Sequence, residues 1–313
     1  MDKADLIADE LDQTTALSST TRGGGKRGSG RGGRGGGGRS GGRAVDLSRA
    51  LSRLLRHQAS NAGIELDKEG YAPLDKVLAW PPLKSLSPTF PEILSAVTNS
   101  DKQRFSLKLN PSSSSSTNDE TSTSPQDWLI RANQGHSIPL VSSEALLKPL
   151  AINPSPEKGE LPIPPVVVHG TYFAFWPLIK SSGGLKKMGR NHVHFSTGLP
   201  EGDEGVISGM RRDAELLVYV DVEKAIKEGG MRFWMSENGV VLTEGEGEEG
   251  RVGVEFFREV VGRRKGEVGV IWRDGEAVGE GELPGGLRVR VPHGKGGRGG
   301  RGGRGGRGRG RGQ

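Results

Sequence analysis

The chain has 313 residues, with 52 glycines, no cysteine, 5% aromatic residues and a formal net charge of +6. The lack of cysteine excludes disulfide bonds, thiolate metal sites and cysteine nucleophiles, and no apolar run approaches the ~20 residues of a membrane span. We therefore expect a soluble intracellular protein of about two domains, nuclear and/or cytoplasmic, with no membrane partner and no need for more than a monomer.

Two glycine-arginine repeats flank the central part of the chain. Residues 22–43 and 293–313 each contain seven Lys or Arg residues and no acidic residue. Such segments lack the apolar residues that offset chain entropy, and their cations neutralise RNA phosphates. We expect disordered tails at 1–43, acidic and then RGG-rich, and at 293–313, which bind RNA non-specifically. Solubilising tails without a partner are the alternative.

The segment Leu51–Gln58, LSRLLRHQ, predicts the first helix, with Asp46 as its N-cap and Gly63 near its C-terminal end. Its apolar stripe consists of Leu47, Ala50, Leu51, Leu54 and Leu55. Arg56 and His57 lie off that stripe. They form either a solvated cationic face at the helix end or an anion site.

The rest of residues 44–150 predicts two more helices and a hairpin. The elements are, in order, a short strand in IELD, a turn at Asp67–Gly70, a helix from Pro73, a helix in PEILSAVTNS, and strands from Arg104 and Trp128. The Ser/Thr-rich insertion between the strands, residues 110–127, is too polar to pack and is expected to be disordered. Three helices and a hairpin predict a winged-helix-like lobe.

A second lobe is expected at residues 166–260, after a proline-rich linker at 151–165. Its elements are a strand in PVVVHGT, a helix in FAFWPLIKSSGGL, strands in NHVHFST and AELLVYVD, a helix in VEKAIKEGG, two strands in FWMSENGVVLTEG, and a closing strand in VGVEFF. Residues 261–292 form an uncertain extension, with short strands in GVIW and LRVRV at most.

Nine segments of the chain resemble, in the same order, one family: the NAD-dependent RNA (tRNA) 2′-phosphotransferases. They are LSRLLRHQ, GIELDKEGY, DKQRFSL, IRANQGHS, VVVHGT, NHVHFST, SGMRRDAELLVYVD, FWMSENGVVLT and VGVEFF. HGT or HVH alone would be a weak signal, whereas nine segments covering most of residues 47–257 are a specific one.

The resemblance implies an α+β protein of two lobes. An N-terminal winged-helix lobe would grip an RNA 2′-phosphate, and a C-terminal lobe of the ADP-ribosyltransferase fold would bind NAD as co-substrate. The implied reaction transfers the splice-junction 2′-phosphate of ligated tRNA to NAD, giving 2′-hydroxyl RNA, nicotinamide and ADP-ribose 1″,2″-cyclic phosphate. It is the final step of tRNA splicing.

The family's catalytic residues carry over onto Arg56 and His57 of LLRHQ, Arg131 of IRANQGHS and Arg211 of SGMRRD. Guanidinium groups grip phosphate oxygens bidentately, so Arg56, His57 and Arg131 are expected to hold the phosphate. Arg211 would stabilise the charge that grows in the second step, and His57 would shuttle a proton. Arg212 stays an alternative to Arg211, because neighbours in a strand face opposite ways.

For NAD, the resemblance implies contacts from residues of the second lobe. They are His169, Gly170, Thr171, Gly184, Leu185, His194 and Ser196. Val240 stands where transferases of this fold often carry Glu, and a phosphate dianion, already a nucleophile, needs no base there. No metal is expected.

Three rival hypotheses stay open. His192 and His194 share a strand face and could form a zinc site with His169. The protein could instead be a catalytically inactive RNA-binding protein that acts through its RGG arms. It could also be a transferase that adds ADP-ribose to proteins or to nucleic-acid ends; Val240 argues against protein acceptors, which leaves terminal phosphates.

Overall fold

The computed structural model describes residues 39–287 with short gaps. The gaps are residue 101, residues 113–119, residue 140, residues 200–209, residue 212 and residue 265. Three expected features therefore lie wholly or partly outside the described residues. They are the tails, the 110–127 insertion and the segment LRVRV. The described chain combines helices with several β-sheets, so the α+β class is confirmed. Within it, no helix is long and apolar enough to cross a membrane.

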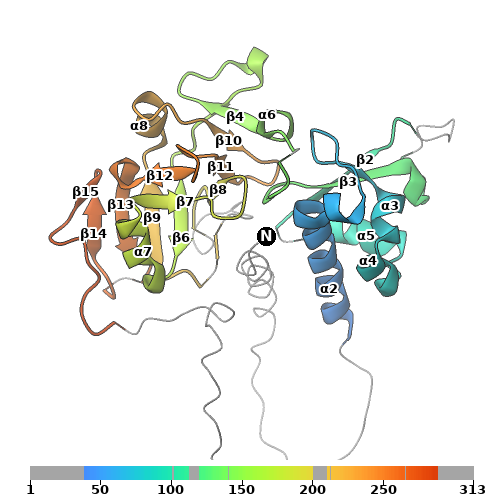
Figure 1. The fold of residues 1–313 in the computed structure, drawn as a ribbon, viewed down its shortest axis with the longest axis horizontal. Coiled ribbons are helices and arrows are strands. Elements are labelled where there is room, and N and C mark those ends of the chain that lie inside the picture. The colour runs from blue at the N-terminus through green and yellow to red at the C-terminus, as the bar shows by residue number, and fades with distance from the viewer. Residues whose placement is uncertain are drawn as a thin grey trace, which may run out of the picture.

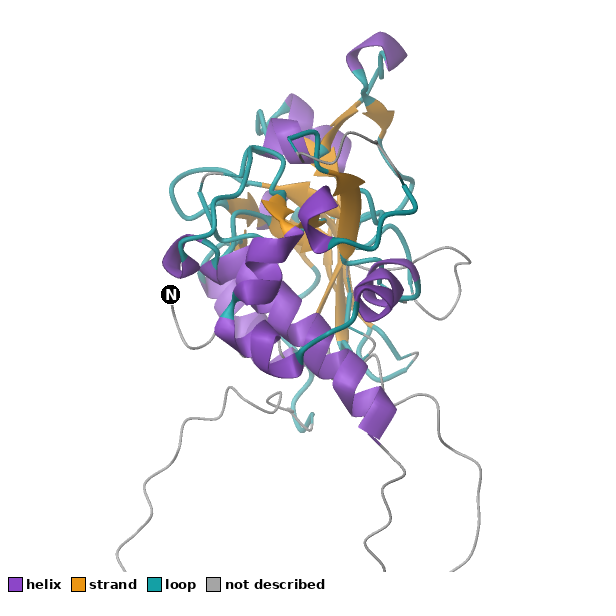
Figure 2. Cartoon of the chain, turned by 90° about the vertical axis from the view of Figure 1, so that its right-hand side faces the viewer, coloured by secondary structure: helices purple, strands orange, loops and turns teal. Residues whose placement is uncertain are grey.

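Residues 39–138 form what we call the helical part. Its elements are α2 (Arg39–Arg53), α3 (Leu74–Ala79), α4 (Pro81–Leu86), α5 (Phe90–Thr98), β1 (Ala72–Pro73), β2 (Phe105–Leu109) and β3 (Trp128–Ala132). The helices lie close together on one side of the molecule (Figure 1), and Figure 2 shows them in front of the strands. Leu51, Leu74, Ile93 and Ile130 are fully buried and belong to one hydrophobic cluster.

Helix α2 begins earlier than its sequence pattern predicts. It starts at Arg39, so Asp46 lies inside the helix and the N-cap prediction is wrong. The reason is a tertiary contact. The Arg43 guanidinium donates to both carboxylate oxygens of Glu92 on α5, at 2.6 and 3.1 Å, and this ion pair holds the first turns of α2 in place.

The end of the first helix is not α-helical. After α2 the chain forms one π-helical turn, Leu54–Gln58, and then a 3-10 turn, Ser60–Ala62. Gly63 closes this segment as expected, in the left-handed conformation with φ 68°. The π-helical turn was not predicted, because one such turn hardly changes the apolar spacing that identifies a helix.

The other expected elements of the helical part are present. Helix α3 follows Pro73, and a capping box of Thr89 and Glu92 starts α5. Strands β2 and β3 pair antiparallel, with Ser106 opposite Arg131. The short helix α4 was not predicted. The expected strand in IELD is absent, and the turn follows this segment at Lys68 and Glu69.

Residues 141–287 form what we call the sheet part. Its helices are α6 (Ser143–Leu146), α7 (Trp176–Ser181) and α8 (Val222–Lys227). Its strands are β4 (Lys148–Ala151), β5 (Leu161–Pro162), β6 (Val168–Thr171), β7 (Gly184–Lys186), β8 (Val193–Phe195), β9 (Leu216–Val220), β10 (Phe233–Met235), β11 (Val241–Thr243), β12 (Arg251–Gly253), β13 (Phe257–Gly262), β14 (Val270–Arg273) and β15 (Glu276–Ala277). They form sheets ordered β5-β4-β10-β11-β8 and β15-β14-β13-β9-β6, and the pair β12-β7. Residues of both five-stranded sheets share one core, including Phe195, Phe233 and Phe257.

Two segments of the sheet part differ from expectation. VGVEFF is not one strand, because it ends β12, makes a 3-10 turn (Val254–Phe256) and begins β13. Since β12 pairs with β7 and β13 with β9, the chain changes sheets inside this segment. The proline-rich segment 151–165 also carries structure, because β5 pairs with β4 in parallel.

Hydrogen bonds fasten the helical part to the sheet part. The Asn191 backbone N–H donates to the His136 carbonyl at 2.8 Å, and the Asn238 side chain donates to the Lys102 carbonyl at 2.9 Å. The first bond brings the loop after β3 to the start of β8. The candidate site lies at this junction.

Candidate functional site

The π-helical turn carries Arg56 and His57 into the interior of the protein. The two residues are only 2% and 7% exposed. Burying a cation is costly unless it has partners or a ligand, and π-turns occur frequently at functional sites. The burial therefore excludes the alternative of a solvated cationic face and favours an anion site.

The loop after β3, residues 133–138, encloses this pair. The Ser137 backbone N–H donates to the Arg56 carbonyl at 3.0 Å, and the Ser137 hydroxyl lies 3.0 Å from His57 Nδ1. Gly135 has φ 88°, and a Cβ at this position would lie 3.4 Å from Arg56 Cζ. The positive φ is what favours glycine at this position, since a contact of 3.4 Å is an ordinary van der Waals distance.

Arg131 enters the same region from β3. Its guanidinium group lies 4.7 Å from the centroid of the Tyr71 ring. Its Nη2 donates to Glu237 Oε2 at 2.9 Å, and the same carboxylate oxygen accepts from the Ser106 hydroxyl at 2.8 Å. Glu237 lies on the turn between β10 and β11, so this ion pair connects the helical part to the sheet part.

The Arg211 side chain lies in space beside the end of β6. Its Cζ is 5.5 Å from the centroid of the Tyr172 ring, and Tyr172 directly follows β6. Burial is the main cause that lowers the pKa of His169, and the nearby Arg211 guanidinium lowers this pKa further. Arg212 lies outside the described residues, so the choice of Arg211 over Arg212 stays a prediction.

The expected NAD-contacting residues fall into two groups. His169, Gly170 and Thr171 lie on β6, His194 lies on β8, and Ser196 joins β6 through two backbone hydrogen bonds of 3.0 and 2.8 Å to Val168. Gly184 and Leu185 lie on β7, which pairs with β12 in a different sheet.

The first group makes close contacts. His169 Nδ1 donates to the His194 carbonyl at 2.9 Å. Buried His194 Nε2 has no hydrogen-bond partner among the described residues. A Cβ at Gly170 would lie 2.3 Å from the nearest side-chain atom, so only glycine fits there.

Burial keeps the imidazole rings of this region neutral. It is the largest cause that lowers the pKa of His136 to about 3, and the Arg56 guanidinium is the next. Burial likewise lowers the pKa of His192 to about 4, and it holds those of His169 and His194 below the usual value. At neutral pH the positive charge of the region is therefore carried by arginines and not by these four rings.

The arginines of the two parts meet around β8. The pKa of His194 is lowered first by burial and then by neighbouring cations, among them Arg190 of the sheet part and Arg56 of the helical part. Arg56 and Arg131 in turn both lower the pKa of His136. Cations of the helical part therefore act on imidazole rings of both parts, those of His136 and His194.

The geometry gives no support to a three-histidine zinc site. His192 Nε2 lies 2.8 Å from the Ser143 hydroxyl, and His169 Nδ1 is bonded to a backbone carbonyl. In residues 39–287, gaps aside, no group of three or more His, Asp or Glu side chains is arranged to hold a metal ion.

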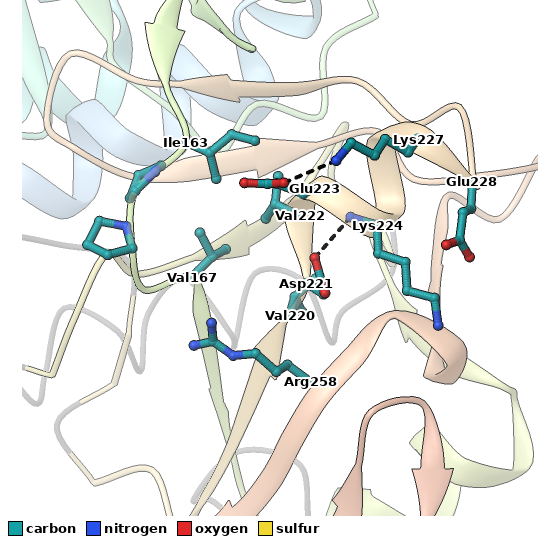
Figure 3. Close-up of a pocket in the computed structure, with 12 residues that line it drawn as sticks. Ile163, Val167, Val220, Asp221, Val222, Glu223, Lys224, Lys227, Glu228 and Arg258 are labelled. Atoms are coloured by element: carbon teal, nitrogen blue, oxygen red, sulfur yellow. Dashed lines mark hydrogen bonds and ion pairs between the residues drawn. The ribbon is translucent and has the colours of Figure 1, made fainter. Parts of the chain in front are cut away.

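A surface pocket of about 530 Å³ lies elsewhere, between residues 163–167 and α8 (Figure 3). Its walls include prolines and valines. Some of the charges at its edge are engaged within the protein, since Lys227 bonds Glu223 at 3.3 Å and the Asp221 carboxylate caps α8. None of the expected site residues lines this pocket, so it is not the candidate site.

Several residues that hold the arginines were missed by the sequence analysis. Tyr71 and Ser137 lie inside the recognised segments, and their place in those segments is the only signal that could have found them. Glu237 is 106 residues from Arg131, so no local pattern could have paired them. Tyr172 looked like one more apolar residue beside the strand.

Arginines largely shielded from water beside neutral imidazoles are typical of proteins that bind a multiply charged anion such as phosphate. Comparison with known proteins makes this class more specific. Residues 42–245 match the model described as "RNA 2'-phosphotransferase, Tpt1 / KptA family". The chain belongs to the RNA 2′-phosphotransferase family, so the sequence resemblance and the enzyme class that it implied are confirmed.

Curated relatives agree with this assignment. The chain is 39% identical over 205 residues to "tRNA 2'-phosphotransferase 1" of Danio rerio, a match that covers 65% of this chain and 80% of the relative. It is 37% identical over 219 residues to the human protein of the same name, covering 70% and 76%. The "tRNA 2'-phosphotransferase" of Saccharomyces cerevisiae is 33% identical over 220 residues, covering 70% and 84%.

Proposed function

We propose that the protein transfers the splice-junction 2′-phosphate of ligated tRNA to NAD, releasing 2′-hydroxyl RNA, nicotinamide and ADP-ribose 1″,2″-cyclic phosphate. The observation that carries this proposal is the buried group of Arg56, His57 and Arg131 in a chain of the RNA 2′-phosphotransferase family. The names of its relatives support tRNA as the RNA substrate.

The helical part holds the RNA phosphate. A phosphomonoester carries nearly two negative charges, and each hydrogen bond from a charged group contributes roughly 1.5–3 kcal/mol. Arg56 and His57 are fixed by the loop that contains Ser137, and Arg131 is supported by the Tyr71 ring. These side chains are therefore pre-arranged for the phosphate before it binds.

The ends of β6 and β8 suit NAD, which supplies the ribose carbon that accepts the phosphate. Glycine is needed at Gly170 because Met210 and Ala214 fill the place that a side chain would take, and this close packing fixes β6 beside His169. His169 and His194 are neutral, so they do not repel the positively charged nicotinamide ring of NAD. Gly184 and Leu185 on β7 complete the proposed NAD contacts.

Two steps then follow from the positions of these groups. In the first, Arg56 and Arg131 orient one phosphate oxygen toward the ribose carbon, and the new O–C bond replaces the bond to nicotinamide. In the second, His57 takes the proton of the attacking ribose hydroxyl and returns it to the RNA 2′ oxygen as that oxygen separates from phosphorus. Arg211 stabilises the charge that grows on the phosphate oxygens.

We also propose the finer fold assignment of the two parts. The helices α3 and α5 with the hairpin β2–β3 support a winged-helix lobe, and the two five-stranded sheets support an ADP-ribosyltransferase lobe. Val240, at the position of the acceptor-activating Glu, is fully buried in a hydrophobic cluster. A phosphate dianion needs no base there.

The test is incubation of the protein with a short RNA that carries one internal 2′-phosphate, with and without NAD. Loss of the phosphate and release of nicotinamide are followed together. We expect both only with NAD, and neither in the Arg131→Ala variant. The matched control is Arg232→Ala, since Arg232 is 63% exposed and pairs with Glu144 outside the site.

The rival functions give different results in the same assay. An RNA-binding protein without catalysis would bind the RNA and leave it unchanged. A transferase that modifies terminal phosphates would release nicotinamide and add ADP-ribose to RNA ends, while the internal phosphate stays in place.

We further propose that the two RGG arms bind RNA non-specifically around a monomeric, metal-independent enzyme in the nucleus and/or cytoplasm. Each contacted phosphate should make log affinity fall by roughly 0.7 per log unit of salt for single strands. RNA binding by the full chain should therefore weaken steeply with salt, while turnover of a short substrate at low salt should not need the arms.

A further inference from the structure

Arg211 has an aromatic support that the family resemblance does not assign. The Tyr172 ring, 4% exposed, lies 5.5 Å from Arg211 Cζ, and the Tyr172 hydroxyl donates to Asp213 Oδ1 at 2.8 Å. Among the described residues, Arg211 forms no ion pair with a carboxylate. Tyr172 contacts Arg211 through its ring and also through its hydroxyl, which accepts a hydrogen bond from the guanidinium group.

The chain around Arg211 is attached to the end of β6. The Glu215 backbone N–H donates to the Thr171 carbonyl at 2.8 Å, and the Glu215 carboxylate accepts from the Phe173 N–H at 3.2 Å. The Arg211 carbonyl accepts from Arg263 Nη1 at 3.1 Å. These bonds fix the backbone, but they leave the long Arg211 side chain free to rotate.

The Tyr172 ring can remove that freedom. Its own position is fixed by burial and by the Asp213 bond, and it packs edge-on against Phe175 with centroids 6.1 Å apart. Burial raises the pKa of Tyr172 to about 12, so the hydroxyl stays protonated and keeps donating to Asp213. A carboxylate that accepts from a phenol makes the ring more electron-rich, and an electron-rich ring attracts a guanidinium group more strongly.

We propose that Tyr172, held by Asp213, is a positioning residue that aims the Arg211 guanidinium group at the phosphate during the second chemical step. The inference rests on the proposed function. An arginine held without a carboxylate partner keeps its full charge for the substrate. Tyr172 restrains it through its ring and one hydroxyl contact, which leaves the other N–H donors of Arg211 for the phosphate. This explains why an aromatic side chain, and not an acid, contacts Arg211.

The test is a double-mutant cycle measured as single turnover of the 2′-phosphorylated RNA with NAD. Cation–π contacts of this kind correspond to roughly 2- to 30-fold in rate. Tyr172→Leu should slow phosphate loss by about that factor, but it should leave the first release of nicotinamide nearly unchanged. In an Arg211→Ala background, Tyr172→Leu should have no further effect, because the group that it positions is already absent.

Two milder variants protect the test against misfolding. Tyr172→Phe keeps the ring but loses the hydroxyl that contacts Arg211 and Asp213, so it should rescue part of the rate lost in Tyr172→Leu. Asp213→Asn keeps the hydrogen bond but removes the charge, so it should fall between wild type and Tyr172→Leu. Equal slowing by Tyr172→Leu in both backgrounds would mean a structural role and would overturn the inference.

Failure of the proposed function is distinguishable from failure of this inference. If the wild-type protein releases no nicotinamide, the proposed function fails. A crystal structure of the Tyr172→Leu variant then still decides the positioning role. We expect the Arg211 side chain to leave its place beside His169, and an unmoved side chain would contradict the proposal.

Discussion

Arg56 and Arg131 come from two different elements, a π-helical turn and a strand, and both lower the pKa of the His136 ring. Arg56 is almost fully buried, and the Arg131 side chain is 11% exposed. Both guanidinium groups are therefore shielded from bulk water. A guanidinium group binds phosphate most strongly in such shielded surroundings. At the scale of single residues, the account therefore depends on guanidinium geometry as well as on positive charge.

Replacement of Arg56 by lysine separates geometry from charge. Lysine keeps one positive charge but cannot make two parallel hydrogen bonds to phosphate. We expect Arg56→Lys to lower kcat/KM for the 2′-phosphorylated RNA by roughly 10- to 100-fold, the effect of one lost charged hydrogen bond. Steady-state kinetics beside Arg232→Lys checks this, and equal rates for Arg56→Lys and wild type would argue against a bidentate grip.

Glu237 accepts a hydrogen bond from Arg131 Nη2, an N–H group that the proposed phosphate contact requires. The Glu237 side chain is 56% exposed, so it can move away when RNA binds. Removal of its charge should therefore strengthen RNA binding. We expect Glu237→Gln to lower the KM for RNA by roughly two- to fivefold, as for a partly exposed ion pair. Glu144→Gln, which breaks the exposed pair with Arg232, is the control; an increased KM for Glu237→Gln would show that the carboxylate orients Arg131 instead.

At the scale of elements, the loop of residues 133–138 determines where Arg56 and His57 lie. Gly135 is its critical position, since it combines φ 88° with close contact to the Arg56 guanidinium group. Alanine there should lower the free energy of unfolding by about 1–2 kcal/mol through its backbone conformation. It should also displace Arg56 and lower turnover by at least about tenfold.

Gly230 provides the matched control for Gly135. It has φ 62°, and nothing lies within 4 Å of a Cβ placed there. Gly230→Ala should therefore lose similar stability but keep its turnover. Chemical denaturation and steady-state kinetics of both variants check this, and equal turnover losses would remove the special role of the Gly135 contact.

The sequence allowed the prediction of most elements of the fold, where local signals suffice. The apolar stripe of LSRLLRHQ and the turn residues before Tyr71 correctly located a helix and a turn. The start of α2 could not be predicted, because the Arg43–Glu92 ion pair across 49 residues holds it. VGVEFF looked like one strand because only its partners, β7 and β9, show where it divides.

The candidate site was predictable only as a set of residues. Family resemblance identified Arg56, His57 and Arg131, but their burial and mutual contacts depend on the tertiary fold. Tyr71 and Glu237, which contact Arg131 from distant segments, carry no local signal.

At the scale of the whole molecule, one buried neutral histidine in each part, His136 and His192, makes stability depend on pH. The pKa of His136 is about 3 and that of His192 is about 4, both well below the 6.5 of an unfolded chain. Below pH ~6.5 the unfolded state therefore binds protons that the folded state does not bind. The contribution of these histidines to the free energy of unfolding is present above that pH and is lost as the pH falls toward 4.

The expected loss is about 1.4 kcal/mol per pH unit for each such histidine. Urea unfolding at several pH values between about 7.5 and about 5 measures this loss of unfolding free energy. His136→Gln should reduce the slope by one histidine's share. An unchanged slope would mean that His136 titrates normally in the folded protein.

The central claim is that phosphate moves from RNA to NAD at this site, and the destination of the phosphorus atom tests it most directly. An RNA with a labelled internal 2′-phosphate is incubated with the full-length protein, with and without NAD, and the products are separated. We predict that the label moves, only with NAD, into a small molecule that contains adenosine. Label that appears as inorganic phosphate without NAD, or that stays in the RNA under both conditions, would contradict the account.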